Sequence, residues 1–327
     1  MRKITLLLLI AACAVSSVSA QKVLDAKDSV KELAKGKDDK EGWTKVGGIG
    51  GNFSWLSLIN PRAGAGDNRI GFGGLLNYSA NLVQGKIISN NKIGLQLDVV
   101  QNGSAPYAKA TDVLAASSQF GYKIGKEDGK WYVAGLADFQ SQLLPTYGAN
   151  YLKAKPFAGK DKDSTLSLTG ALFSPATFKL APGVIYKPNA KMTILFSPVA
   201  LKAVIVSDKK LAQSEKFFPQ NTAKDKTVDV QVGAEIRADY VSKFFNDRLV
   251  YATTLDLYSN YLRNPQNIDL EWYHSIDVMV TKSVSLNFKS DWFYDDDIKV
   301  FTDGDALKPT KNVFFRNAFL LKFSRLF

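Results

Sequence analysis

The stretch VDVQVGAEIRADY, residues 228–240, decides the fold class of this chain. Its even-numbered residues are apolar, and its odd-numbered residues are polar or glycine. Successive side chains of a β-strand point to opposite faces, so the segment has one apolar face and one charged face. A helix would repeat every 3.6 residues instead. The stretch therefore predicts an amphipathic strand.

The same alternation recurs along the chain from Trp43 onward. The segments are about 11–16 residues long, whereas strands of globular proteins average about 5–6 residues. Crossing an outer membrane takes about 9–11 tilted residues. We therefore expect an all-β protein, a single closed antiparallel transmembrane β-barrel of about twelve strands. The expected strands are 43–58, 68–83, 91–101, 110–124, 130–143, 177–187, 191–206, 227–241, 248–261, 268–281, 284–294 and 313–327.

The connections between these segments alternate in length. Short connections at 188–190, 242–247 and 282–283 follow even-numbered strands, and long ones at 144–176, 207–226 and 295–312 follow odd-numbered strands. Bacterial barrels have short periplasmic turns and long outer loops. This asymmetry favours twelve strands. Ser164–Phe173 is a further candidate strand and leaves fourteen as the alternative.

The N-terminus indicates export. Arg2 and Lys3 precede the apolar run Ile4–Ala12, and Val18-Ser19-Ala20 forms a small-residue cleavage site. This pattern predicts a signal peptide over residues 1–20, cleaved after Ala20. A lipoprotein box ending at Cys13 is the alternative. We expect a periplasmic segment over 21–42, with at most a short helix within 26–35, and the barrel over 43–327, in a bacterial outer membrane.

Composition narrows the possible partners. Cys13 is the only cysteine, so cleavage leaves no thiolate, disulfide or cysteine metal site. Cleavage also lowers the net charge from +11 to +9. Basic proteins attract nucleic acid, anionic lipid or acidic solutes. For an exported chain we expect outer-membrane lipid as a partner and no nucleic acid.

The C-terminal segment ends on an aromatic residue. Phe315, Phe319, Phe323 and Phe327 share one face of the last expected strand. A closing strand that ends in Phe is similar to the recognition signal read by the outer-membrane assembly machinery. We therefore expect that machinery to be a partner through Phe327.

Several short motifs resemble a barrel family common in Bacteroidetes. Its opening is similar to Gly51-Asn52-Phe53-Ser54, Asn60 and Gly64–Asn68, although Pro61 stands where that family usually has Trp. Its middle is similar to Phe173-Ser174-Pro175, Gly183–Asn189 and Phe196-Ser197-Pro198. The family is described as outer-membrane barrels of unknown function. The resemblance implies a location and a fold, and no activity.

The candidate catalytic, metal-binding and phosphate-binding residues do not match the motifs that such sites require. His274 is the only histidine, and the adjacent Ser275 points to the opposite strand face, so the two cannot form a catalytic pair. We expect His274 in an outer aromatic girdle. Asp295-Asp296-Asp297 lacks the spacing of a calcium loop. The glycines of 47–51 are not followed by Lys-Ser/Thr, so they form no phosphate loop. We expect no enzyme activity, metal or cofactor.

The charged strand faces predict the lining of the lumen. In the hairpin 268–294 a turn centred on Ser283 predicts Asp277 directly opposite Lys289, either as a structural ion pair or, with Glu235, as a polar constriction. We expect Trp272, Trp292, Tyr294 and Phe315 to face outward near the extracellular boundary. The expected lumen-lining residues are Glu235, Arg237, Asp277, Lys289, Asp291, Arg316 and Lys322.

The leading functional hypothesis is a narrow channel or an uptake or efflux conduit for small solutes. The main rival is a structural or partner-binding barrel with a plugged lumen, whose function lies in its loops or in residues 21–41. A lipid-modifying enzyme is a distant third.

Overall fold

A computed structural model describes residues 41–56, 69–104, 107–126, 129–147, 168–213, 226–281, 284–295, 300–301, 309–310 and 313–326. The expected signal peptide, Cys13, most of the expected periplasmic segment and Phe327 lie outside these residues. No helix in the described ranges is both long and apolar enough to cross a membrane.

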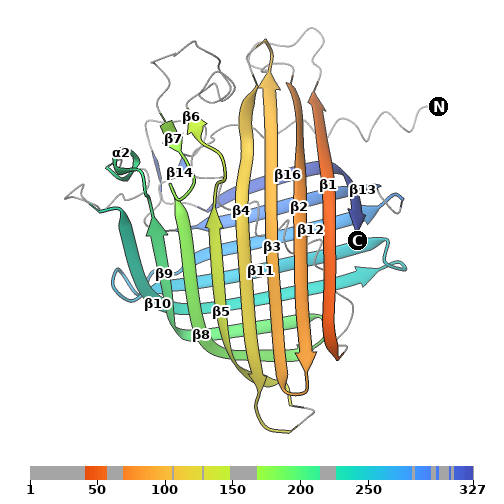
Figure 1. Ribbon diagram of the computed structural model, residues 1–327, viewed down its shortest axis with the longest axis vertical. Coiled ribbons are helices and arrows are strands. Elements are labelled where there is room, and N and C mark those ends of the chain that lie inside the picture. The colour runs from red at the N-terminus through yellow and green to blue at the C-terminus, as the bar shows by residue number, and fades with distance from the viewer. Residues whose placement is uncertain are drawn as a thin grey trace.

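Long strands dominate the structure, which confirms the predicted all-β antiparallel architecture. Within the described residues twelve strands form one closed sheet, because β1 pairs with β16 as well as with β2. In Figure 1 the strands of the near and far walls cross, as tilted barrel strands do. The twelve are β1 (Gly42–Leu56), β2 (Arg69–Gln84), β3 (Ile87–Asn102), β4 (Ala108–Lys123), β5 (Trp131–Ser141), β8 (Ala176–Asn189), β9 (Met192–Ile205), β10 (Val228–Phe244), β11 (Leu249–Asn260), β12 (Asp269–Met279), β13 (Val284–Tyr294) and β16 (Phe314–Leu326).

The remaining elements lie outside this ring. β6 (Thr146–Tyr147) pairs with β7 (Leu168–Gly170), and β14 (Val300–Phe301) pairs with β15 (Pro309–Thr310). The short helix α2 (Lys209–Ala212) begins after Asp208, whose carboxylate accepts hydrogen bonds from the first-turn amides. Of the alternative candidate strand Ser164–Phe173, the described residues from 168 onward contain β7, which does not join the ring.

The two ends of the sheet differ in connection length. Residues 85–86, 190–191 and 245–248 are tight turns at one end, where only four residues also separate β12 from β13, and residues 142–175, 206–227 and 295–313 are long connections at the other. Figure 1 shows β6, β7 and α2 together at this second end, uppermost in the view. We call the two ends the turn end and the loop end.

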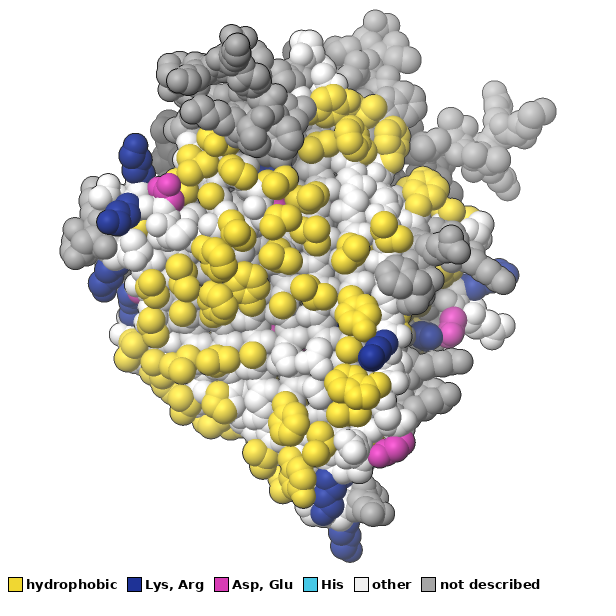
Figure 2. Space-filling model, in the orientation of Figure 1, with side chains coloured by type: hydrophobic (Ala, Val, Ile, Leu, Met, Phe, Trp, Pro, Cys, Tyr) yellow, Lys and Arg dark blue, Asp and Glu magenta, His cyan; other side chains and the backbone are white. Residues whose placement is uncertain are grey.

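Burial alternates along the strands and separates an inner face from an outer face. In β11 every even-numbered residue from Val250 to Asn260 is buried. The outer face keeps large exposed apolar side chains, such as Phe72, Val133 and Leu180. Figure 2 shows apolar side chains spread over the visible wall, with most charges near its margins. The sheet therefore has an apolar exterior, and its inner face carries the buried charged and polar side chains together with buried apolar ones.

Candidate functional site: the interior of the barrel

The predicted lumen residues occupy the inner face. Glu235, Arg237, Asp277, Lys289 and Asp291 are all buried and alternate with outward apolar neighbours. The strand register places Arg316 opposite Asp291 and Lys322 opposite Ser285. The side chains of Arg316 and Lys322 lie outside the described part of the chain.

A lysine holds the centre of a buried ion-pair layer. Lys179 Nζ of β8 lies 3.0 Å from Glu235 Oε1 of β10 and 3.0 Å from Asp256 Oδ2 of β11. All three side chains are nearly inaccessible, and Glu235 is 0% exposed. Buried carboxylates and ammonium groups are stable only when they are paired. The three residues therefore form one ion-paired unit, in which a single lysine faces two carboxylates.

The same layer extends across the interior through Arg237. Its NH1 atom lies 2.8 Å from Asp138 Oδ2 of β5, three strand spacings away around the ring. Lys92 of β3 interacts electrostatically with Asp138, Arg237 and Asp239. Because β3 and β10 are five steps apart in the closed strand order, these charges meet across the lumen. We call Lys179, Glu235, Arg237, Asp256 and Asp138 the ionic layer.

An apolar cluster fills the interior closer to the turn end. The side chains of Ile185 and Leu195 are 0% and 1% exposed, although both lie on inner faces. Gly121 makes room for this cluster, because an added Cβ would lie 2.9 Å from Ile88 Cγ1. The cluster also includes Ala200 and Tyr258, which lie closer to the loop end; we call its other members the apolar layer, namely Ile88, Tyr132, Ala134, Leu136, Ala181, Ile185 and Leu195.

The predicted register of the β12–β13 hairpin is wrong by one step. Asp277 lies opposite Asn287, and Lys289 lies opposite Ser275. The turn closes where Val280 N donates to Val284 O over 2.9 Å, so it is centred on residue 282 and not on Ser283. Asp277 and Lys289 are diagonal neighbours on the inner face. Asn287 Nδ2 donates to Asp277 Oδ1 over 3.0 Å.

Hydrogen bonds also order the loop end around Asp112. Its carboxylate accepts bonds from Leu143 N (2.9 Å) and Leu144 N (2.8 Å), and Lys109 Nζ lies 2.6 Å away. Lys109 Nζ also donates to Leu144 O. A buried carboxylate thus fixes the chain where it leaves β5.

Two of the motif serines are structural. Ser174 and Ser197 are both fully buried. Ser197 Oγ donates to Pro182 O over 2.7 Å, and Ser174 Oγ accepts from Asp208 N over 2.9 Å. Each serine hydroxyl forms a hydrogen bond with a backbone group that would otherwise lack a partner, which explains the serine in both Phe-Ser-Pro segments.

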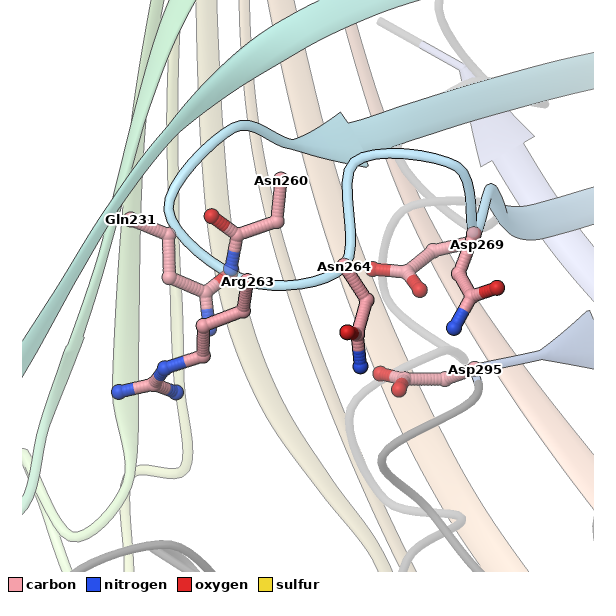
Figure 3. Close-up of a pocket in the computed structure, with 7 residues that line it drawn as sticks. Gln231, Asn260, Arg263, Asn264, Asp269 and Asp295 are labelled. Atoms are coloured by element: carbon pink, nitrogen blue, oxygen red, sulfur yellow. The ribbon is translucent and has the colours of Figure 1, made fainter.

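A small polar pocket opens at the loop end between β10, the β11–β12 connection and the end of β13 (Figure 3). Its space for water-sized molecules is about 30 Å³, enough to hold water. Arg263 beside it forms an ion pair of 2.8 Å with Asp229. The pocket is lined by Gln231, Asn260, Arg263, Asn264, Asn267, Asp269 and Asp295.

His274 and Ser275 lie on opposite faces, as predicted. Ser275 is buried and accepts a bond from Asn287. His274 points outward and shares a 3.0 Å hydrogen bond with Tyr251 OH. Its ring packs against Trp272, with 4.6 Å between centroids, and Trp272 contacts Trp292 edge-on. The Phe315 side chain lies outside the described residues; its backbone is level with Trp292.

The sequence prediction missed Lys179, Asp256 and Asp138. Each has apolar residues on both sides in the sequence, for example Phe178 and Leu180 around Lys179. That alternation indicates an inward charge at all three positions. Among the described residues no group of three or more His, Cys, Asp or Glu side chains is placed to hold a metal. Asp296 and Asp297 are outside those residues.

Comparison with known proteins gives limited information. A family model described as a protein of unknown function (DUF3078) matches residues 53–147, less than half of the chain. No curated protein matches.

Similar solved structures are outer-membrane barrels. An outer membrane channel from Pseudomonas putida F1 is 9% identical, with a TM-score of 0.39, over 90% of this chain and 98% of its own. The translocator domain of the autotransporter NalP from Neisseria meningitidis is 9% identical, with a TM-score of 0.38, over 92% of each chain. TM-scores this low assign neither ligand nor activity.

Proposed function

We propose that this protein is an integral β-barrel of a bacterial outer membrane whose lumen is closed by its own side chains. On this proposal its activity lies at its surfaces, as a structural or partner-binding barrel. The proposal has two parts, the membrane position of the outer face and the closure of the lumen.

The dimensions of the outer face support the membrane position. On β5 and β8 the pair Trp131–Tyr186 lies eight residues from the pair Phe139–Phe178. Eight residues span about 27 Å along a strand, or roughly 20 Å in height at the usual tilt, close to the ~25 Å apolar band of outer-membrane barrels. Aromatic side chains concentrate at the two edges of such bands. Exposed Val133 and Leu180 lie between the two pairs.

One observation carries the closure: the ionic layer is stacked on the apolar layer inside the same ring. A water-filled pore would leave accessible surface on the side chains that line it. At these two levels Glu235, Ile185 and Leu195 expose 1% of their surface or less. The two cations and three carboxylates of the ionic layer pair with one another, which leaves at most one net negative charge in this layer.

Planar-bilayer recording of the purified, folded protein tests this function. We expect no stable conductance steps, with or without residues 21–41. Fractionation should place the protein in the outer membrane. Steady single-channel steps from the unmodified protein would refute the closed lumen, whereas recovery outside the outer-membrane fraction would refute the location.

A narrow conduit for small solutes is the second candidate, and the polarity of the ionic layer favours it. Ion pairs exchange partners with water more readily than apolar contacts do, and replacing buried ion pairs by apolar groups often stabilises a protein. Because the ionic layer consists of charged side chains and not of apolar ones, its ion pairs could separate while a solute passes. On this candidate Lys179→Met produces conductance steps. Lys202→Met is the matched control, because Lys202 lies opposite Lys179 but over the Tyr258 ring.

A further inference from the structure

The outer face of β10–β13 contains a polar row that lipid does not explain. Tyr240, Thr253, His274 and Ser290 are directly opposed across four neighbouring strands. Among the described residues, the other outward side chains of these strands, away from the strand ends, are aliphatic or aromatic. We call these four residues the outward polar row.

The row lies at mid-height of the wall. His274 is five residues from each end of β12, about 17 Å along the strand in either direction. On the proposed membrane position, this depth is in the hydrocarbon layer. Polar and ionisable side chains there are costly and usually meet a partner.

Neighbouring aromatic residues form hydrogen bonds with some, but not all, of the polar atoms in this row. Trp272 Nε1 donates to Thr253 Oγ1, and Trp292 Nε1 donates to Ser290 Oγ, each over 3.0 Å. Tyr251 OH is bonded to His274 Nδ1. The indole N–H groups therefore point along the wall to the row and not to the membrane–water boundary, where belt tryptophans place their polar edge. No described side chain is hydrogen-bonded to His274 Nε2, and the His274 ring is partly exposed outward.

We propose that the outward polar row is the centre of an interface with a second copy of this chain. This proposal rests on the membrane position proposed above. A two-fold interface requires a surface that is complementary to itself. The Thr253 hydroxyl already donates to Tyr273 O over 2.8 Å. Hydroxyl and imidazole groups both donate and accept hydrogen bonds, so Tyr240, His274 and Ser290 can pair with the same residues of a second copy, whereas an apolar or singly charged row would not gain in this way.

The size of the patch fits a weak contact between two copies. Four strands at a spacing of about 4.8 Å, with one row of outward residues on either side of the polar row, cover roughly 20 Å by 20 Å. A face of about 400 Å² on each partner buries about 800 Å² in total, less than the roughly 1,200 Å² of a stable interface, so the contact belongs to the weak class. Side chains such as Ser, Thr and His form hydrogen bonds across interfaces within membranes.

Cysteine crosslinking in isolated outer membranes tests the second copy. Ser290→Cys is introduced in a Cys13→Ser background, which leaves one cysteine in the chain. A bis-maleimide crosslinker should produce a band of twice the chain mass; it is used in place of oxidation because Ser290 ends the row, so a two-fold axis through the row centre holds the two cysteines farther apart than a disulfide spans. Val133→Cys, equally outward but on β5, is the matched control and should stay at single mass.

A second variant tests the row itself. His274→Leu in the Ser290→Cys chain should lower the crosslinked fraction at least fivefold, and Ser118→Leu on β4 should leave it unchanged. Heat-dependent gel mobility verifies that each variant is folded.

Several results would overturn the inference. They are a single-mass band from Ser290→Cys, equal crosslinking of Val133→Cys, a crosslinked product of another mass, or full crosslinking of His274→Leu. When any of them occurs with the protein in the outer-membrane fraction, the dimer fails and the membrane position stands. Absence from that fraction refutes the membrane position itself.

Discussion

Arg237 NH1 lies 2.8 Å from Asp138 Oδ2, although 99 residues separate them in the chain. Both side chains are buried on the inner face of the barrel. Removing one member of a buried ion pair leaves an uncompensated charge and costs about 3–5 kcal/mol. We therefore expect Arg237→Gln to lower the free energy of unfolding by about that amount, measured by urea titration of the folded barrel.

The exposed pair Lys243–Asp247 is the control for this variant. Its side chains are 40% and 66% exposed, at a distance of 3.1 Å. Exposed pairs contribute about 0–1 kcal/mol, so Lys243→Gln should leave the urea midpoint nearly unchanged. The double variant Arg237→Gln/Asp138→Asn should recover part of the loss. Equal effects of Arg237→Gln and Lys243→Gln would show that the ionic layer is hydrated.

Gly183 permits a close approach between β8 and β9. A Cβ at this position would collide with Phe196 O, where the ladder between the strands is interrupted. Relieving such a collision requires a backbone shift that costs about 1–3 kcal/mol. Gly183→Ala should lower the unfolding free energy by that amount. Gly135→Ala meets no atom within 4 Å and should be neutral or slightly stabilising; equal losses at both positions would contradict this account.

Asp112 should be important for order at the loop end. Asp112→Ala removes the acceptor for Leu143 N and Leu144 N and leaves Lys109 without its carboxylate. We expect a loss of about 3 kcal/mol and faster proteolysis after β5. Lys109→Met/Asp112→Ala should be more stable than Asp112→Ala alone, because no buried charge remains unpaired. A double variant as unstable as the single one would assign the loss to the amide bonds alone.

Alternation in the sequence predicts the face of a residue but not its partner. Period two places Glu235 and Lys289 inward, as observed, since a strand has only two faces. Which residue lies opposite depends on the turn, and a shift of its centre from Ser283 to residue 282 replaces Lys289 by Asn287 opposite Asp277. Contacts across the ring, such as Arg237 with Asp138, depend on how all twelve described strands close.

The apolar layer shows where alternation fails. Residues 131–137 of β5 are apolar or glycine on both faces, because Tyr132, Ala134 and Leu136 fill the interior while Trp131 and Val133 face outward. When both faces of a strand are apolar, the sequence does not show which face points into the barrel. From the sequence, the proposed closed lumen could therefore be predicted only as one of two alternatives.

The proposed membrane position can be tested at two consecutive residues, Trp131 and Tyr132. Trp131 is 51% exposed on the outer face, and Tyr132 is 6% exposed in the apolar layer. In lipid vesicles with brominated acyl chains, a variant that keeps Trp131 as its only tryptophan should be strongly quenched. Bromine near the ester groups should quench it more than bromine at the chain ends, because Trp131 begins its strand.

A variant whose only tryptophan comes from Tyr132→Trp is the matched control. Its indole lies on the opposite face of the same strand, so brominated lipid should leave its fluorescence nearly unchanged. The two variants differ only in whether their single tryptophan stands at residue 131 or at residue 132. Quenching at residue 132 together with its absence at 131 would mean that the facing of β5 is reversed, since a one-residue shift exchanges the two faces of a strand. Absence of quenching at both positions would mean that this wall does not contact lipid.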